Sequence, residues 1–247
     1  MVSAWQSVGF NHGVMNTDNM SILGETFDYG PYAFMETYNP NYICNHTDSQ
    51  GRYSFSNQPS IAEWNCYALA SALIDLFSET ELRDILNKFN DYFYDSLIEK
   101  YRKKLGFKSA LDSDYDLLLG LFEIMEREKL DYTNTFRDLS MIITSSDDLK
   151  LSGNFSSWLA SYKARLGKDE NNIEQSISVM HENNPKYILR NYLAQSAIED
   201  AEEGKSEKID QLVEVLSNPF DDLGKSMEKY CKPAPKEQQN QQLSCSS

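Results

Sequence analysis

Most of the chain carries the apolar pattern of amphipathic helices, which limits the possible folds more than any other feature of the sequence. From about residue 60, apolar residues recur at intervals of three and four, and Gly, Asn, Asp or Pro residues interrupt the pattern. Capping-box sequences at Ser60 and Ser78 mark two helix starts. The predicted helices cover residues 61–76, 79–105, 114–128, 133–144, 154–166, 170–182, 185–203 and 206–216. We therefore predict a mainly α-helical fold.

A short polar pattern precedes this helical body. His12 is followed seven residues later by Asn19, and the run Phe-Asp-Tyr-Gly places Asp28 nine residues further on. In the protein-kinase pattern H-R-D-x-x-x-x-N, the Asn holds a metal ion and a later D-F-G supplies a second ligand. The spacing is kept here, but Val14 stands where that pattern has its catalytic Asp. We predict that His12 has a structural role and braces the loop backbone.

Three oxygen-bearing side chains in this region have the types that phosphate chemistry requires. Asn19 and Asp28 offer hard oxygen ligands for Mg²⁺, which would bridge the phosphates of a nucleotide. The attacking hydroxyl also needs a proton acceptor, and Asp18 is our candidate base. We predict two very short strands at 21–24 and 26–27, forming a β-hairpin that brings the metal ligands together.

The position of this pattern in the chain predicts which part of a kinase-like protein is present. Only eleven residues precede His12, whereas the lobe that grips ATP comes before such a loop. We predict a kinase-like carboxy-terminal lobe, with the amino-terminal lobe absent from these 247 residues. We place this lobe at 1–217, with the catalytic and metal loops at 12–30, an activation-segment-like loop at 31–60 and the helical body at 61–217. A flexible tail follows at 218–247.

Composition excludes some classes of partner. The net charge of −15 and a pI near 4.6 argue against nucleic acid or an anionic membrane, because phosphate binding depends on clustered Lys and Arg. No apolar run approaches the roughly 18 residues needed to span a bilayer, and the first residues lack the pattern of a secretory signal. We therefore expect a soluble intracellular protein.

Longer stretches of the sequence resemble one protein family. The stretches 12–40, 51–59, 131–137 and 184–195, together with the terminal Cys-Ser-Ser at 245–247, are similar to the SelO (selenoprotein O) family of pseudokinases. The resemblance covers nearly the whole chain. This family is known for protein adenylylation, in which ATP binds in a flipped orientation and AMP passes to Ser, Thr or Tyr hydroxyls of other proteins.

The resemblance implies roles for the residues of the opening loop. Asp18 matches the family's proton acceptor, and Asn19 and Asp28 match its ligands for Mg²⁺, or for Mn²⁺ in its place. ATP and hydroxyl-bearing protein substrates are the implied partners. The family's glycine-containing nucleotide loop, Lys-Glu pair and phosphate-contacting arginines precede the part represented here. We therefore predict that this chain alone neither holds ATP tightly nor transfers AMP.

The resemblance also bears on the cysteines and on location. It implies redox control through the terminal cysteine, so we predict a disulfide between Cys44 and Cys245 that pins the tail across the 31–60 loop; the alternative is two unpaired thiols. We expect Cys66 to be a small core residue. The Cys-Ser-Ser ending resembles cysteine-only members and favours a bacterial cytoplasm, whereas a eukaryotic member would be mitochondrial.

Other readings remain open at the level of sequence. A small-molecule kinase of the aminoglycoside or choline type keeps an Asp two residues after the His, which Val14 does not provide. A non-catalytic protein-binding module is the second alternative. The acidic run 112–116 is interpreted as a helix start rather than a calcium loop. Lys186 and Arg190 either face the active site or pair with acidic neighbours, and we favour a structural role for the 184–195 helix that carries them.

Overall fold

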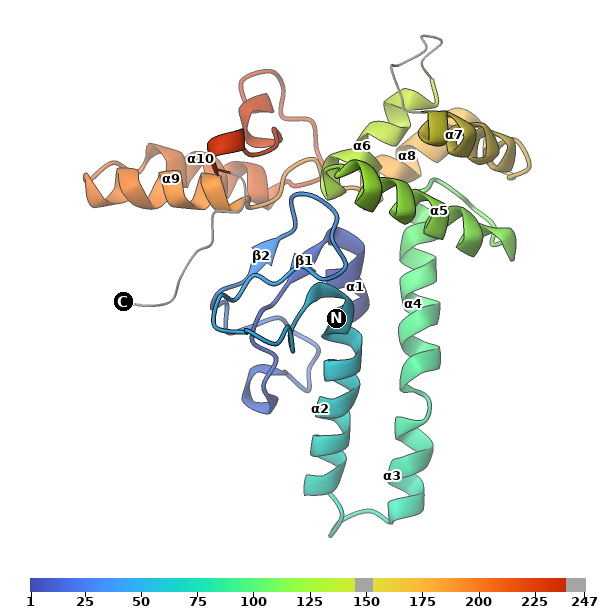
Figure 1. Ribbon diagram of the computed structural model, residues 1–247, viewed down its shortest axis with the longest axis vertical. Coiled ribbons are helices and arrows are strands. Elements are labelled where there is room, and N and C mark those ends of the chain that lie inside the picture. The colour runs from blue at the N-terminus through green and yellow to red at the C-terminus, as the bar shows by residue number, and fades with distance from the viewer. Residues whose placement is uncertain (145–152, 239–247) are drawn as a thin grey trace. The chain divides into compact units, whose positions relative to one another are not determined.

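In a computed structural model of the chain, the structure describes residues 1–144 and 153–238 (Figure 1). These residues are mainly helical, as predicted, with one small two-stranded sheet. They divide into two compact units. The described residues of the first unit are 1–33 and 40–99, and those of the second unit are 34–39, 100–144 and 153–238.

The first unit contains short elements followed by long helices. Its elements are α1 (Val2–Val8), β1 (Phe10–Asn11), the 3-10 turn η1 (Thr17–Asn19), the first residue of β2 (Ala33–Phe34), η2 (Phe55–Asn57), α2 (Gln58–Ala72), α3 (Glu79–Leu86) and the first part of α4 (Phe89–Lys104). Helix α1 ends at Gly9, whose left-handed backbone (φ 72°) is the usual helix terminator. We did not predict α1, because seven residues are too few to show a helical period.

The predicted hairpin at 21–24 and 26–27 is wrong. Those residues form a turn and irregular backbone, while the strands β1 and β2 pair with each other on either side of the loop. The reason is burial: Ile22 and Leu23 are 82% and 77% exposed, whereas Phe10 and Ala33 are buried. Strand pairing therefore forms where the side chains have a core to pack against.

The helix starts differ in how well the capping pattern predicted them. Ser78 forms the predicted capping box, because its Oγ accepts from the Glu81 N–H at 3.4 Å and its own N–H donates to the Glu81 carboxylate at 3.0 Å. Helix α2 instead begins at Gln58, so the capping box predicted at Ser60 is wrong. Pro59 occupies the first turn of α2, where its fixed φ suits a helix and its missing N–H costs nothing.

The long helix predicted over 79–105 is two helices. Helix α3 ends at Leu86 and α4 begins at Phe89, with Asn87 and Lys88 between them. Figure 1 shows α3 running back alongside α2, and the amide of Asn90 at the start of α4 donates to the Glu63 carboxylate of α2 at 3.1 Å. The apolar stripe crosses the break without interruption, which is why periodicity did not reveal it.

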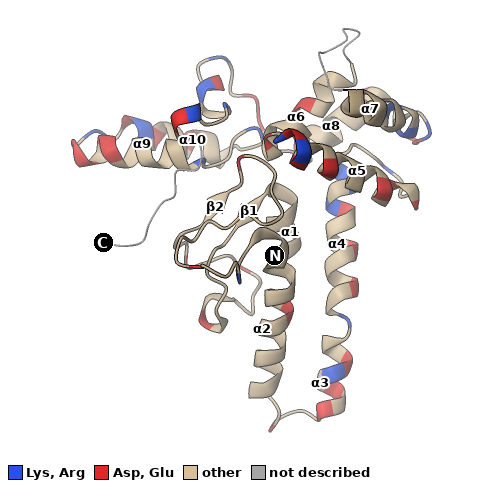
Figure 2. Cartoon of the chain, in the orientation of Figure 1, with Lys and Arg blue, Asp and Glu red and all other residues tan. Residues whose placement is uncertain are grey.

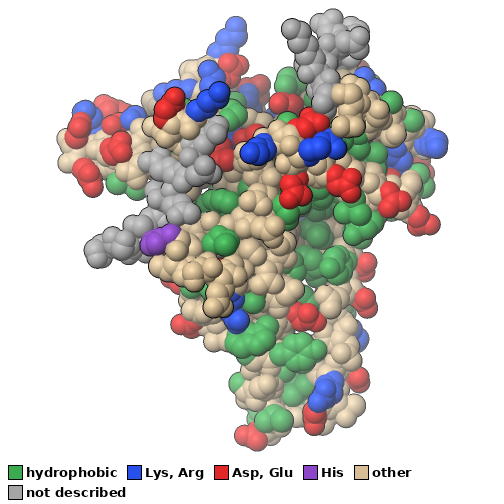
Figure 3. Space-filling model, viewed as in Figure 1, with side chains coloured by type: hydrophobic (Ala, Val, Ile, Leu, Met, Phe, Trp, Pro, Cys, Tyr) green, Lys and Arg blue, Asp and Glu red, His purple; other side chains and the backbone are tan. Residues whose placement is uncertain are grey.

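Charged and apolar side chains are distributed unevenly over the first unit. Figure 2 shows few Lys or Arg residues on the loops around β1 and β2. Figure 3 shows hydrophobic side chains exposed over α2 and α3. The large exposed residues of α2, α3 and the turn between them are Trp64, Tyr67, Leu69, Ile74, Leu76, Phe77 and Ile85. Of the helices in the described residues, none has the length and apolar content required to cross a bilayer.

The second unit contains the rest of the helices. Its elements are the end of α4, α5 (Ser113–Glu128), α6 (Tyr132–Ile142), α7 (Gly153–Leu166), α8 (Ile173–Asn183), α9 (Asn191–Glu202), α10 (Glu207–Ser217), η3 (Glu228–Tyr230) and η4 (Lys236–Gln238). These confirm the predicted helices to within a few residues, except that α9 starts six residues after the predicted 185. Residues 184–190 are not helical, and Pro185 favours the extended backbone that Asn184 adopts.

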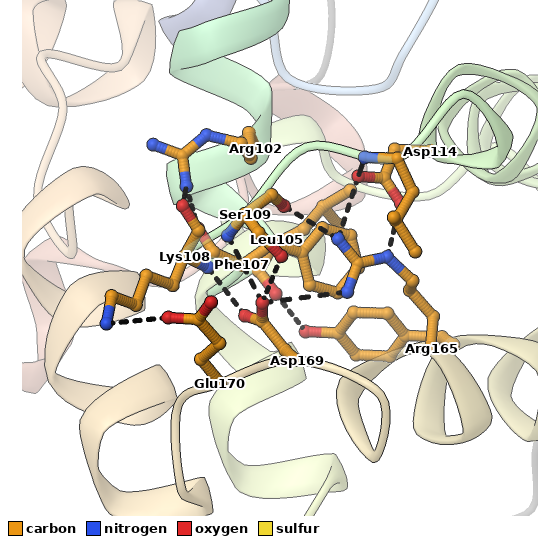
Figure 4. A network of polar contacts seen from close by, with 11 residues as sticks. Arg102, Leu105, Phe107, Lys108, Ser109, Asp114, Arg165, Asp169 and Glu170 are labelled. Atoms are coloured by element: carbon orange, nitrogen blue, oxygen red, sulfur yellow. Dashed lines mark hydrogen bonds and ion pairs between the residues drawn. The ribbon is translucent and has the colours of Figure 1, made fainter.

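An arginine on α7 organises the loop between α4 and α5 (Figure 4). Arg165 donates to both oxygens of Asp114 at 2.5 and 2.9 Å and to the Ser109 carbonyl at 2.7 Å, and its guanidinium lies 4.2 Å from the centre of the Phe107 ring. Asp169 accepts from the N–H groups of Lys108 and Ser109 at 2.6 and 3.1 Å. Asp114 lies in the first turn of α5, which confirms that the 112–116 run starts a helix.

A second buried arginine joins distant parts of this unit. Arg190 is 0% exposed and donates to Asp131 at 2.7 and 3.2 Å, to Asn134 at 3.3 Å and to the Glu36 carboxylate. Lys186 pairs with Asp222 at 2.7 Å. The predicted structural role of Arg190 and Lys186 is confirmed.

Part of the predicted tail packs onto the helices. Tyr230 is 4% exposed and belongs to a hydrophobic cluster with Tyr187 of the 184–190 segment, Ala197 of α9, and Leu212 and Val215 of α10. The N–H of Ala234, also buried, donates to Glu36 at 3.4 Å. The described residues of the 218–247 segment are therefore integrated into the second unit.

Candidate active site

Polar side chains of α2 form hydrogen bonds with the backbone of the opening loop. The Gln58 side chain accepts from the His12 N–H at 2.9 Å and donates to the Phe10 carbonyl at 3.0 Å. Two turns along the same helix face, Asn65 donates to the Met15 carbonyl at 2.9 Å. Gln58 and Asn65 are both buried, so these bonds fix the loop backbone in a site that excludes water.

His12 connects this loop to the segment that carries Asp28. The His12 ring is buried, and its Nε2 lies 2.9 Å from the Phe27 carbonyl oxygen, while the Val14 N–H donates to Nδ1 at 3.4 Å. Because Nδ1 accepts, Nε2 carries the proton and donates to Phe27. Trp5 of α1 packs its ring 5.3 Å from that of His12 and donates to the Thr26 hydroxyl at 2.8 Å. The bracing role predicted for His12 is confirmed.

The turn η1 presents Asp18 and Asn19. The Asn19 amide nitrogen donates to the Val14 carbonyl at 3.2 Å, which fixes the side chain. Its Oδ1 accepts no hydrogen bond from the described residues, and the exposed carboxylate of Asp18 forms none with them either. Both oxygen groups are therefore available to a ligand.

Asp28 occupies an unusual backbone conformation. Its φ is 55°, a left-handed value that residues other than Gly rarely adopt and that Asp tolerates better than most. Its carbonyl accepts from the Gly30 N–H at 2.8 Å, and its exposed side chain has no ion pair with a described residue. Strained positions of this kind concentrate at functional sites.

Asp18, Asn19 and Asp28 carry oxygen donors of the types that Mg²⁺ prefers. Among residues 1–144 and 153–238, no three His, Cys, Asp or Glu side chains are grouped so as to hold a metal. The chain thus offers one amide oxygen, from Asn19, and the carboxylates of Asp18 and Asp28. Mg²⁺ in phosphoryl-transfer sites is bound through one or two carboxylates plus substrate oxygens and water, which is consistent with this donor set.

Cys44 is buried rather than exposed on the 31–60 loop. It is 3% exposed, and its Sγ donates to the Asn11 side-chain oxygen at 2.7 Å. Burial raises the pKa of the Cys44 thiol to about 12, which disfavours the reactive thiolate. Gly13 (φ 79°) packs so closely that a Cβ there would lie 2.6 Å from this sulfur.

The other cysteine predictions have different outcomes. Cys245 lies outside the described residues, so its disulfide with Cys44 stays a prediction. Cys66 is half-buried on α2, so it does not occupy a full core position.

Three residues that hold the opening loop were not predicted, namely Trp5, Gln58 and Asn65. The sequence carried no signal for Trp5, and for Gln58 and Asn65 it offered only polar side chains near the start of a predicted helix.

Comparison with known proteins identifies the family of the chain. The family model described as "Protein adenylyltransferase SelO" matches residues 1–217. The chain therefore belongs to the SelO family, as the sequence resemblance predicted.

Curated relatives support the same assignment. A protein of Pseudomonas fluorescens (strain Pf0-1) named protein nucleotidyltransferase YdiU is 44% identical over 254 residues, covering 100% of this chain and 52% of the relative. Proteins of the same name from Cupriavidus metallidurans and Photobacterium profundum are 39% and 44% identical, covering 100% and 90% of this chain and 49% and 47% of the relatives. The chain thus spans about half the length of the relatives it matches.

Proposed function

We propose that this chain supplies the metal-binding and proton-accepting half of a protein adenylyltransferase that transfers AMP from ATP to Ser, Thr or Tyr hydroxyls. One observation carries the proposal: in a member of the SelO family, Asp18, Asn19 and Asp28 present oxygen atoms with no partner among the described residues. The backbone of the Asp18 and Asn19 loop is meanwhile fixed by buried hydrogen bonds. A fixed backbone with unpartnered ligand atoms is the arrangement that binding a metal and a nucleotide requires.

In the proposed reaction, a hydroxyl oxygen of the acceptor protein attacks the α-phosphorus of ATP. The new oxygen–phosphorus bond forms as the bond to pyrophosphate breaks, and pyrophosphate leaves. Asn19 and Asp28 would hold Mg²⁺, which would neutralise charge on the phosphates. Asp18 accepts the proton of the attacking hydroxyl. The fixed Asn19 amide keeps its ligand oxygen oriented throughout.

We further propose that the chain alone is inactive, with the groups that grip the triphosphate supplied by the part of the relatives it does not span. Arg52 is the only Lys or Arg in residues 1–82, so the loop region offers little positive charge to three phosphates. Charge-assisted hydrogen bonds contribute about 1.5–3 kcal/mol each. The apolar side chains exposed on α2 and α3 support this proposal, because such patches mark interaction surfaces. We also propose a bacterial cytoplasmic location, which the bacterial sources of the relatives support.

Transfer of labelled phosphate tests the proposal. The chain would be assayed alone and fused to the part of the Pseudomonas fluorescens relative that it does not span, with protein acceptors, Mg²⁺ and ATP labelled at either the α- or the γ-phosphate. We expect label from α-labelled ATP only, in the fusion only, and none after chelation of Mg²⁺. Transfer of the γ-label would instead support a kinase. Stoichiometric AMP transfer by the purified 247-residue chain, dependent on Asp28, would contradict the proposed inactivity.

A further inference from the structure

Arg52 is unlike every other arginine in the chain. The other six, Arg83, Arg102, Arg127, Arg137, Arg165 and Arg190, each donate hydrogen bonds to a carboxylate or a carbonyl. The exposed guanidinium of Arg52 donates none to the described residues. In a chain of net charge −15, an arginine whose guanidinium has no hydrogen-bond acceptor among the described residues requires an explanation.

The backbone around Arg52 is tightly held. One oxygen of Asp48 accepts from the Arg52 N–H at 2.9 Å and the other accepts from the Tyr53 N–H at 2.8 Å. The Asn57 side chain donates to the Arg52 carbonyl at 2.5 Å. The loop therefore presents Arg52 from a defined position.

Two aromatic rings hold the guanidinium itself. Its carbon lies 5.1 Å from the centre of the Trp64 ring and 5.7 Å from that of Tyr53, within the range of cation–π attraction. Trp64 is 49% exposed, so the rings orient the arginine without covering it. A planar guanidinium supported in this way keeps its N–H donors free for a bidentate contact.

This surface is attached directly to the candidate active-site loop. The Tyr53 hydroxyl donates to the Asn16 side chain at 2.5 Å, and Asn16 lies two residues before Asp18. Asn65, the neighbour of Trp64 on α2, donates to the Met15 carbonyl at 2.9 Å. The same short stretch of chain thus supports both the arginine and the proposed base.

We propose that Arg52, Tyr53 and Trp64 form a recognition site for a carboxylate of the acceptor protein, next to the hydroxyl that is modified. This inference rests on the proposed function. Arg52 is the only Lys or Arg in residues 1–82, so it is the side chain of this stretch that attracts an acidic segment. Tyr53 is hydrogen-bonded to Asn16, which precedes Asp18 in the sequence, whereas the proposed metal ligand Asn19 follows Asp18. Asp18 is the residue that must meet the acceptor hydroxyl.

Peptide binding tests this inference without requiring catalysis. Fluorescein-labelled peptides of eleven residues, with a central Ser or Tyr and either Glu or Gln at the flanking positions, would be titrated with the 247-residue chain at low salt. We expect the Glu peptides to bind at least about fivefold more tightly. Arg52→Gln should remove the preference, Arg52→Lys should keep part of it, and Arg52→Glu should transfer it to peptides with flanking Lys.

A matched control and a separate arm make the result decisive. Arg83→Gln and Arg83→Glu change the same charge on an exposed arginine that is paired with Glu79, and they should leave the preference unchanged. Asp28→Ala should also leave it unchanged, so a failure of the proposed chemistry stays distinguishable from a failure of this site. Inorganic tripolyphosphate serves as the probe for nucleotide.

Three results would overturn the inference. The first is absence of binding to either peptide, and the second is equal binding of Glu and Gln peptides by the wild-type chain. The third is an Arg52→Gln variant that loses affinity for tripolyphosphate but keeps the preference for Glu peptides, because Arg52 would then serve the nucleotide instead of the acceptor. Circular dichroism of each variant checks that the fold is retained.

Discussion

The opening loop of the first unit and the ion networks of the second unit use the same residue types in opposite ways. In the second unit, Arg165 and Arg190 are buried and donate to carboxylates placed against them. In the opening loop, Asp18 and Asp28 are exposed and have no partner among the described residues, although the backbone of the Asp18 loop is held by buried bonds. Charged side chains that are paired inside the protein stabilise the fold, whereas charged side chains without partners on a fixed backbone are available to a ligand.

Removing one partner of a buried network should have the largest effect on stability. Arg190→Leu leaves Glu36 and Asp131 without their cation, and burial already raises the pKa of the Glu36 carboxyl. We expect a loss of about 3–5 kcal/mol in the free energy of unfolding, measured by urea denaturation. Adding Glu36→Gln should recover part of the loss, because it removes one uncompensated buried charge. An unchanged midpoint would mean that this network does not stabilise the second unit.

The opposite pattern is expected at the opening loop. Asp28→Asn should reduce AMP transfer by the fusion enzyme by about 100-fold or more, because a metal-ligating carboxylate is lost. It should change the unfolding free energy by less than about 0.5 kcal/mol, as for an exposed residue without structural contacts. Activity assays and urea denaturation of the same variant provide both numbers. A large loss of stability with normal transfer would reverse the assignment of Asp28.

Lys104 tests what happens to a buried charge that has no carboxylate partner among the described residues. It is 2% exposed at the end of α4, with its Nζ 4.4 Å from the centre of the Phe136 ring, and burial lowers the pKa of its ammonium from 10.5 to about 7. Between pH 7 and 10.5 the unfolded chain therefore binds one proton more than the folded chain, so stability contributed by this group rises with pH.

We expect this rise to reach up to about 2 kcal/mol between pH 7 and 9, relative to Lys104→Met. Methionine keeps the length of the side chain without the charge, so the variant should also be more stable than the wild type at pH 7. Urea titrations of both proteins at several pH values measure the difference. Parallel pH profiles for the two proteins would show that Lys104 is not desolvated in the fold.

Only a small effect on stability is expected at Arg52, which completes the comparison among arginines. Arg52→Gln loses two cation–π contacts at an exposed site, so we expect a change of no more than about 1 kcal/mol in unfolding free energy. Thermal denaturation beside Arg190→Leu makes the contrast direct. If Arg52→Gln destabilised the chain as much as Arg190→Leu, Arg52 would be a structural residue and not a recognition residue.

The sequence predicted the helices well where a long apolar period extended over a single element, as in α5 and α7. It failed where a local break or a distant partner decided the outcome. Asn87 and Lys88 divide a continuous stripe into α3 and α4, and the hairpin predicted at 21–24 and 26–27 did not form because its apolar residues have no core to cover. At the site, spacing alone selected Asp18, Asn19 and Asp28, but it gave no sign of Gln58 or Asn65.

By itself, the sequence determined the helical class, the family and the oxygen-bearing residues of the opening loop, because these depend on period, motif and side-chain chemistry. The tertiary structure decided which charged side chains are paired and which have no partner among the described residues. Arg190 and Glu36 are 154 positions apart in the chain, and no local pattern relates them. Arg52 has a guanidinium of the same chemistry, yet it lacks a carboxylate partner among the described residues. Electrostatic pairing depends on distance in space, which the fold alone sets.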